Sequence, residues 1–188
     1  MSTSTMYIAI QGEAGSYHEQ AAQQYFGERY RPFYCKTFEE VFAAVLDGAA
    51  GYGVVAIGNT IYGPINEVQT LLDKHAAAVE VIGQTTLPIH HCLIGLPGAR
   101  FADIKTVHSQ YMALGQCLRF LRSRLSQAAL VEETDTAGSV ALIATRQDPS
   151  AAAVASGAAA ELHHLSVLQP NIEDTPDNLT TFLILRPR

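Results

Sequence analysis

Three segments of the chain place small or hydroxyl residues directly after a strand-like run and before a helix-like one: Glu13–Ser16, Asn59–Gly63 and Thr134–Gly138. The N-terminus of a helix carries unpaired backbone N–H groups and about half a unit of positive charge, which favour carboxylates and phosphates. Residues of these types are also ordinary helix caps, which is the simpler explanation of each segment taken alone. Together they predict anion-binding groups at three helix starts, with Thr60 at the second.

Histidine and threonine side chains add further candidates for chemistry. His18 follows the first segment, where the positive end of a helix favours a neutral imidazole that can donate or accept a hydrogen bond. His90 and His91 lie in an apolar extended run, so we expect them on opposite sides of a strand, buried and structural rather than metal-binding. Thr180 and Thr181 begin the last strand with one hydroxyl on each face, a pattern that a ligand site or simple β propensity explains.

The composition excludes several classes of function. The chain has 188 residues, 48% of them hydrophobic, and a formal net charge of −6 without a basic run. Nucleic acid and anionic membrane surfaces are therefore not expected partners. No apolar run is long enough to span a bilayer and no signal peptide is evident, so we expect a cytoplasmic protein. Scattered cysteines and the lack of a nucleotide-binding fingerprint predict no metal and no cofactor.

Strand-like runs alternate with helices of about ten residues, which predicts an α/β fold built on largely parallel sheets with helices on both faces. Two sets of such units, joined by a long extended segment over residues 85–96, predict two α/β lobes with a cleft between them. The expected helices cover residues 17–26, 37–46, 65–74, 113–125, 136–144 and 156–163. The expected strands include residues 7–10, 33–35, 52–57, 79–82, 105–108, 129–131, 151–154, 167–168 and 181–185.

Several motifs, in order along essentially the whole chain, resemble those of the prephenate dehydratase family. They are Gly12–Tyr17, Tyr52–Gly63, Leu87–Leu93, Ala113–Cys117, Asp135–Gly138 and Asn178–Phe182. The resemblance implies two α/β lobes around a cleft, like type II periplasmic binding proteins, with the last strand returning to the first lobe. It places lobe 1 at about residues 1–86 plus 173–188 and lobe 2 at about 87–172. No ACT regulatory domain is expected in a chain ending at Arg188.

The departures from the family motifs concern charged and hydroxyl positions. Gly58 stands in place of the Glu of Glu-Asn-Ser, and Thr60 in place of its Ser. The usual Ser-His-Pro-Gln is Ser109 to Met112 here, and His18 replaces a Ser. Above all, Thr181 replaces the Arg of Thr-Arg-Phe. The resemblance implies that Thr180 assists departure of a ring hydroxyl, whereas the carboxylate-binding charge of the neighbouring Arg is lost.

The resemblance and the helix starts together give one candidate catalytic residue, Thr180, and a set of candidate substrate-binding residues. That set is Ser16, Tyr17, His18, Asn59, Thr60, Ser109, Gln110, Thr136, Ala137, Thr181 and Phe182. The expected ligand is a small dianion, and the family implies a homodimer or higher homo-oligomer.

Three functions fit these residues. The first is prephenate dehydratase, which forms phenylpyruvate, carbon dioxide and water. The second is a prephenate decarboxylase of a secondary-metabolite pathway that keeps the hydroxyl and forms dihydro-4-hydroxyphenylpyruvate, since loss of the Arg removes a stabiliser of the substrate carboxylate. The third is a non-catalytic binder of an aromatic amino or keto acid. The sequence favours the first and leaves arogenate open as a substrate.

Overall fold

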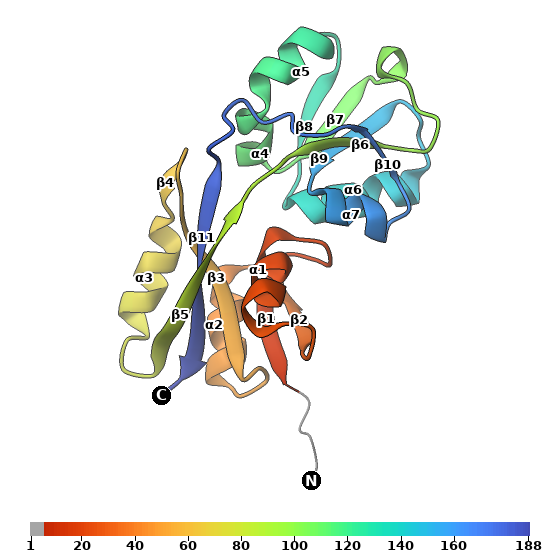
Figure 1. Cartoon of the computed structure of the whole chain (residues 1–188). Coiled ribbons are helices and arrows are strands. Elements are labelled where there is room, and N and C mark those ends of the chain that lie inside the picture. The colour runs from red at the N-terminus through yellow and green to blue at the C-terminus, as the bar shows by residue number, and fades with distance from the viewer. Residues whose placement is uncertain (1–5) are drawn as a thin grey trace. The chain divides into compact units, whose positions relative to one another are not determined.

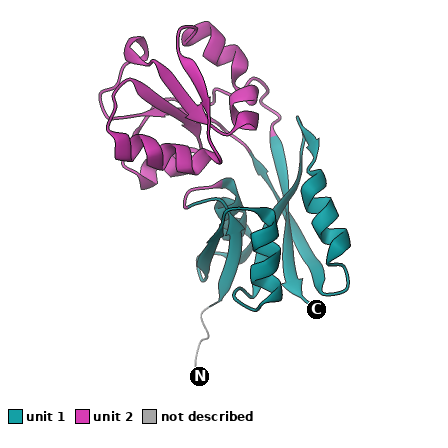
Figure 2. Ribbon diagram, turned by 180° about the vertical axis from the view of Figure 1, so that it is seen from behind, with its two compact units in different colours: residues 1–13, 17–88, 179–188 teal, residues 14–16, 89–178 magenta. Residues whose placement is uncertain are grey.

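A computed structural model describes residues 6–188, which form two compact units (Figures 1 and 2). Among the described residues, unit 1 comprises 6–13, Tyr17–Pro88 and Leu179–Arg188, and unit 2 comprises Ala14–Ser16 and Ile89–Asn178. Each unit has its own sheet, its own helices and its own buried core. The predicted α/β fold with two units is therefore confirmed.

The sheet of unit 1 has its strands in the order β2-β1-β3-β11-β5, with a short β4 paired to β3. Their bounds are β1 (Tyr7–Gln11), β2 (Arg31–Cys35), β3 (Tyr52–Asn59), β4 (Gly63–Pro64), β5 (Val79–Pro88) and β11 (Leu179–Pro187). β1 pairs in parallel with β2 and β3, whereas β11 runs antiparallel to both β3 and β5. The prediction of a largely parallel sheet is thus wrong here, because the chain returns from unit 2 and inserts its last strand in the opposite direction.

Helices cover both faces of this sheet. They are α1 (Tyr17–Phe26), α2 (Phe38–Leu46) and α3 (Asn66–Lys74). Thr37 caps α2 by accepting the N–H of Glu40 at 3.2 Å. The Glu40 carboxylate accepts the N–H of Lys36 at 2.7 Å, one residue before the position of a standard capping box. Thr37 is therefore the N-cap of α2, and the Glu40 side chain bonds to the N–H of residue 36 rather than to that of the N-cap residue.

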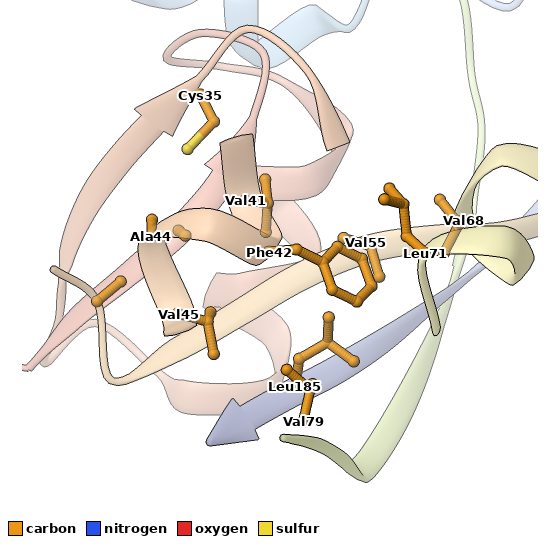
Figure 3. Packing of buried hydrophobic residues seen from close by; sticks show 12 residues of the cluster. Cys35, Val41, Phe42, Ala44, Val45, Val55, Val68, Leu71, Val79 and Leu185 are labelled. Atoms are coloured by element: carbon orange, nitrogen blue, oxygen red, sulfur yellow. The ribbon is translucent and has the colours of Figure 1, made fainter. Parts of the chain in front are cut away.

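The core of unit 1 lies between the sheet and helices α2 and α3 (Figure 3). Phe42 of α2 packs there with Val55 of β3 and Leu185 of β11, and these side chains are at most 1% exposed. Because strand side chains alternate, the neighbouring Ile184 and Phe182 point to the opposite face, where α1 lies. Phe182 contacts His18 of α1 on that face. The sheet therefore has a sealed apolar face and a second face that carries α1.

The sheet of unit 2 has the order β10-β6-β9-β7-β8. Its strands are β6 (Cys92–Gly95), β7 (Thr106–Ser109), β8 (Ala129–Glu132), β9 (Ala151–Ala155) and β10 (Ser166–Gln169). Its helices are η1 (Phe101–Asp103), α4 (Tyr111–Gln116), α5 (Leu118–Arg124), α6 (Thr136–Arg146) and α7 (Gly157–Leu162). Helices α4 and α5 pack on one face of the sheet, and α6 and α7 pack on the other. β7 is parallel to β8 and β9, but β6 is antiparallel to its neighbours, so this sheet is mixed as well.

Two expected elements differ from the structure. The helix expected over residues 113–125 is interrupted at Cys117, whose φ of −113° and ψ of 12° are not helical. Asp174 causes this break, since its N–H donates to the Gln116 carbonyl at 2.7 Å and its carboxylate accepts the N–H of Arg119 at 3.0 Å. The extended segment expected over residues 85–96 belongs instead to two strands, because β5 is continuous from Val79 to Pro88.

Residues 173–178 lie in unit 2 rather than in the first lobe, where the sequence analysis put them. Glu173 accepts the N–H of His91, Asp174 binds the start of α5, and Asn178 donates to Gln116. These polar contacts hold the segment that precedes β11. Over the described residues, no helix is both long and apolar enough to cross a membrane.

Candidate active site

Thr180 of β11 lies beside Asn59 of β3 in unit 1. The two residues are directly paired in the sheet, so their side chains share one face. Asn59 Nδ2 donates to Thr180 Oγ1 at 2.9 Å. Both side chains are partly buried. The hydroxyl oxygen of Thr180 therefore accepts this hydrogen bond, which leaves its own hydrogen for donation to another acceptor.

The orientation of the Asn59 amide is fixed by the turn that follows β3. Its Oδ1 accepts the N–H groups of Ile61 at 2.9 Å and Tyr62 at 3.2 Å. Because two backbone donors must face the oxygen, the amide nitrogen must face Thr180. The turn thus determines which partner of the Asn59–Thr180 pair donates.

Thr181, the next residue, presents its hydroxyl to the opposite face of β11. It pairs with Gly58 of β3 and Thr86 of β5, and its Oγ1 lies 3.1 Å from the Thr86 hydroxyl. The prediction that the two threonines place one hydroxyl on each face is confirmed. Gly58 and Thr181, which replace the family's Glu and Arg, are direct cross-strand neighbours. The negative charge of the family's Glu and the positive charge of its Arg are therefore both absent from this pair of neighbouring residues.

His18 of α1 lies on the same sheet face as Thr180. Its ring meets Phe182 edge-on with 5.0 Å between centroids, and its Nε2 accepts the N–H of Ala56 at 3.2 Å. Burial lowers the pKa of His18 to about 4. The imidazole is therefore neutral at pH 7, as predicted, although burial rather than the helix end is the cause. Since Nε2 is an acceptor, the ring proton lies on Nδ1.

Thr60 is not at a helix start. Helix α3 begins at Asn66, and Thr60 instead pairs with Leu179 at the beginning of β11. Its N–H donates to the Leu179 carbonyl and its Oγ1 accepts the Leu179 N–H, both at 2.9 Å. The prediction of a helix start at Thr60 is thus wrong, and the backbone N–H of Thr60 already has a partner in the sheet. Thr60 holds in place the end of β11 that carries Thr180.

The start of α6 in unit 2 does have the predicted form. Asp135 is the N-cap, and its Oδ1 accepts the N–H of Gly138 at 2.7 Å. Thr136 is partly buried and Ala137 is 1% exposed, at the first two positions of the helix. A side chain added at Gly138 would meet the Asp135 carboxylate at 2.9 Å. The motif at residues 135–138 therefore builds a compact helix start whose first N–H groups belong to Thr136 and Ala137.

Ser16 and Tyr17 join the two units along the chain. Ser16 is 6% exposed and belongs to unit 2 with Ala14 and Gly15, whereas the partly buried Tyr17 is the first residue of α1 in unit 1. Gly15 has a φ of +82°, a conformation that favours glycine.

Ser109 and Gln110 lie at the end of β7 and at the N-cap of α4. Ser109 is fully buried, and its hydroxyl donates to the Val154 carbonyl at 2.6 Å. This bond holds β7 to β9 and directs the hydroxyl at the sheet backbone. Gln110 is partly buried and makes no side-chain capping bond.

A buried polar network of unit 2, which joins residues from three segments, is not predicted from the sequence. Gln116 Oε1 lies 2.6 Å from His91 Nε2 and accepts Asn178 Nδ2 at 2.8 Å. Burial lowers the pKa of His91, so the ring is neutral and its Nε2–H donates to Gln116. His91 is buried as expected, but His90 is exposed and pairs through Nδ1 with Glu173 at 2.8 Å. The sequence signal for this network is the presence of His91 and Gln116 inside the otherwise apolar runs 87–93 and 113–117.

The described residues contain no group of three or more His, Cys, Asp or Glu side chains arranged to hold a metal ion. The site residues are instead hydroxyls, amides, a neutral imidazole and backbone groups. Such groups bind and orient small polar molecules through directional hydrogen bonds.

Comparison with known structures defines the class of fold. A periplasmic substrate-binding protein of an ABC transporter from Coxiella burnetii matches with a TM-score of 0.53 at 11% identity, covering 97% of this chain and 84% of that one, which shows the fold alone. The prephenate dehydratase of Arthrobacter aurescens, solved in complex with L-Phe, gives 0.86 at 26% identity and covers 98% of this chain and 61% of that one. A structure described as a novel type of quorum quenching acylase, GqqA, gives 0.84 at 32% identity over 97% of this chain and 64% of that chain.

The family follows from the sequence comparisons. The model of the prephenate dehydratase family matches residues 8–188. Arogenate dehydratase 2 of Petunia hybrida is 36% identical over 184 residues, which cover 97% of this chain and 45% of that protein. This chain belongs to the prephenate dehydratase family. It spans about half the length of the curated plant relatives that it matches.

Proposed function

We propose that this chain is a prephenate dehydratase, which converts prephenate to phenylpyruvate, carbon dioxide and water. Membership of the family gives the class of reaction, a decarboxylating loss of water. The observation that carries the proposal is the hydrogen bond from Asn59 Nδ2 to Thr180 Oγ1. This hydrogen bond occupies a lone pair of the Thr180 oxygen and leaves its hydrogen to be donated. Thr180 lies in β11, within the family motif Asn178–Phe182.

The reaction needs a donor at the leaving hydroxyl. As the ring bond to the carboxylate breaks, its electron pair moves into the ring and the bond to the 4-hydroxyl breaks at the other end. The hydroxyl leaves as water after taking one proton, which comes ultimately from solvent. A threonine hydroxyl is too weak an acid to transfer its proton early, so Thr180 acts as a hydrogen-bond donor that stabilises the developing charge on oxygen.

Asn59 raises the effectiveness of this donor. By donating to Thr180 Oγ1 it polarises the hydroxyl and removes one of its alternative orientations. Preorganisation of this kind contributes to catalysis because no reorientation is needed when the bond breaks. The neutral His18 ring packs against Phe182, which is 1% exposed, so this pair supports the sheet face that carries Thr180 without adding a charge to it.

The carboxylates of the substrate need hydrogen-bond donors other than Thr180. The backbone N–H groups at the start of α6, at Thr136 and Ala137, have the direction and partial charge that bind an anion. The cap at Asp135 takes the Gly138 N–H, so the binding capacity of this helix start resides in its first two N–H groups. They are the candidate anion-binding groups that unit 2 offers by itself.

The uncharged residue at position 181, whose hydroxyl bonds to Thr86, is the observation that favours a second candidate function. Without the family's Arg at this position, the carboxylate that leaves is less stabilised in the substrate, which assists decarboxylation. A decarboxylase that keeps the ring hydroxyl would need no donor at Thr180. The retained and oriented Thr180 is why we place the dehydratase first.

A proton NMR time course with prephenate tests the proposal. We expect five aromatic protons of phenylpyruvate to appear as the ring signals of prephenate disappear, faster than in a sample without protein. A non-aromatic keto acid formed with loss of carbon dioxide would replace the proposal by the second candidate. Turnover of arogenate to phenylalanine, but not of prephenate, would reassign the substrate. Tight binding of phenylalanine without turnover of either compound would overturn the enzyme assignment.

A further inference from the structure

Residues Ala14–Ser16 form a short excursion of the chain into unit 2, between β1 and α1 of unit 1 (Figure 2). The excursion contains Ser16, one of the candidate substrate-binding residues. The contacts that hold residues 14–16 in place therefore affect a candidate site residue as well as the fold.

A buried hydroxyl of unit 2 bonds to this excursion. Ser156, the N-cap of α7, is 3% exposed. Its Oγ donates to the Gly15 carbonyl at 2.8 Å and accepts the N–H of Ala159 at 3.1 Å. A hydroxyl has one hydrogen, so the first bond uses it and the second uses a lone pair. The two bonds together fix the direction of the Ser156 hydroxyl.

The contact around this hydroxyl is made by backbone atoms. A Cβ added at Gly15 would lie 2.8 Å from the Cα of Ala159, closer than real Cβ atoms approach. The first residues of α7, Gly157 to Ala160, are all small. The loop therefore rests directly on the first turn of α7, and the Ser156 side chain hydrogen-bonds to its Gly15 carbonyl.

Fixing the Gly15 carbonyl also fixes Ser16. The peptide bond between Gly15 and Ser16 is planar and trans, so the direction of its C=O determines the direction of its N–H. A rotation of this peptide would turn the Ser16 N–H and displace the Ser16 side chain. The Ser156 hydroxyl thus controls the orientation of a candidate binding residue that it does not itself touch.

We propose that Ser156 is a positioning residue, which holds the Gly15–Ser16 peptide in the orientation that binds substrate. This inference rests on the proposed function, because it takes Ser16 as part of the substrate site. Ser156 does not contact reacting atoms. Its removal is expected to weaken substrate binding and to leave the chemical step at Thr180 unchanged.

The test compares three variants at Ser156 with a cap variant elsewhere. Ser156→Ala removes both bonds, Ser156→Asp keeps an acceptor for the Ala159 N–H but loses the donor to Gly15, and Ser156→Thr keeps both functions. Thr37→Ala removes the comparable N-cap of α2, which makes no bond to the excursion. It therefore reports the effect of losing a cap alone.

Steady-state kinetics with prephenate give the first readout. We expect Ser156→Ala and Ser156→Asp to raise KM about 3- to 10-fold with kcat within about 2-fold, the range for one lost hydrogen bond. Ser156→Thr should restore most of the wild-type KM, and Thr37→Ala should leave KM unchanged. A wild-type KM in Ser156→Asp, or an equal rise in Thr37→Ala, would overturn the inference.

Hydrogen–deuterium exchange gives a second readout that needs no turnover. In Ser156→Ala and Ser156→Asp we expect faster exchange in peptides covering residues 12–18 than in wild type, and no such change in Thr37→Ala. Unchanged exchange over residues 12–18 in both Ser156 variants would also overturn the inference. If wild type converts neither prephenate nor arogenate, the proposed function fails, whereas the exchange data still decide whether Ser156 holds the excursion.

Discussion

The two units prepare their candidate site groups in different ways. In unit 1, side chains on neighbouring strands orient one another, as Asn59 does with Thr180. In unit 2, side chains orient backbone groups, as Asp135 does at the start of α6 and Ser156 does at Gly15. The first arrangement supplies a particular functional group, and the second supplies peptide N–H groups that every residue except proline carries.

This difference has a consequence for substitutions. Where a side chain is the reacting group, a change of one atom type removes function while the fold is kept. Where the backbone is the functional group, the side chain matters only through its size and through what it holds in place. The following predictions test this contrast, beginning with the largest expected effect.

Thr180→Val should lower kcat/KM by about 10²- to 10³-fold, the range for loss of one preorganised hydrogen-bond donor to the transition state. Valine keeps the shape and the β propensity of threonine, so the sheet pairing and the far-ultraviolet circular dichroism should be unchanged. The matched control is Thr181→Val, one residue along the same strand. Its kcat/KM should fall far less, because the Thr181 hydroxyl of the wild type bonds to Thr86 on the other face of the sheet. Equal losses in the two variants would remove the distinction between the two hydroxyls.

Asn59→Asp should lower kcat/KM by about 10- to 150-fold, because it diverts the Thr180 hydroxyl into a hydrogen bond with a charged group, worth about 1.5–3 kcal/mol. The carboxylate still accepts the N–H groups of Ile61 and Tyr62, so the turn is kept. It no longer donates to Thr180, whose hydroxyl then donates to the carboxylate instead of to the substrate. Steady-state rates at pH 7 measure the loss, and activity equal to wild type would show that the direction of this bond is unimportant.

In unit 1 the sequence indicates candidate site residues but only part of their geometry. Motif order led to Asn59, Thr180 and Thr181, and strand alternation predicted the opposite faces of the two threonines. It could not predict that Thr60 pairs with Leu179, because that contact joins residues 119 positions apart. Nor could it predict mixed sheets, since hydrophobic periodicity carries no information on strand direction.

In unit 2 the sequence predicted local caps but not the contacts between distant segments. Asp135 and Ser156 were expected at helix starts, and both are N-caps. The bond from Ser156 to Gly15 joins residues 141 positions apart, and the break at Cys117 depends on Asp174. Local propensity therefore predicts where a helix begins. Which distant segment the capping side chain also bonds to depends on tertiary contacts.

His18→Gln should flatten the pH dependence of stability. The pKa of His18 is lowered from 6.5 to about 4 in the folded protein, so the unfolded chain binds more protons between these values. Stability from the neutral ring is complete above pH 6.5 and is lost as the pH falls through 4. Urea unfolding at pH 7 and pH 4.5 should show wild type losing about 2 kcal/mol more than the variant. Glutamine keeps an acceptor for the Ala56 N–H, so equal losses would contradict the assignment of this titration to His18.

Gly15→Ala tests the backbone contact of unit 2 against a matched glycine in unit 1. Gly15 and Gly27 have φ values of +82° and +72°, so alanine is strained at both positions by about 1 kcal/mol. A Cβ at Gly27 meets nothing within 4 Å, whereas a Cβ at Gly15 lies 2.8 Å from the Ala159 Cα. The difference between the two variants therefore isolates the approach of the loop to α7.

We expect Gly15→Ala to lower the free energy of unfolding by about 1 kcal/mol more than Gly27→Ala, measured by urea unfolding with unchanged m values. The backbone of the Gly15 loop must move to relieve the contact, so KM should rise in Gly15→Ala and stay at the wild-type value in Gly27→Ala. Such a rise caused by a single methyl group, with no functional side chain removed, would show that unit 2 acts through its backbone. Equal stability and equal KM in the two variants would mean that the Gly15 loop moves away from α7 at no cost. The inference that unit 2 acts through its backbone groups would then be wrong.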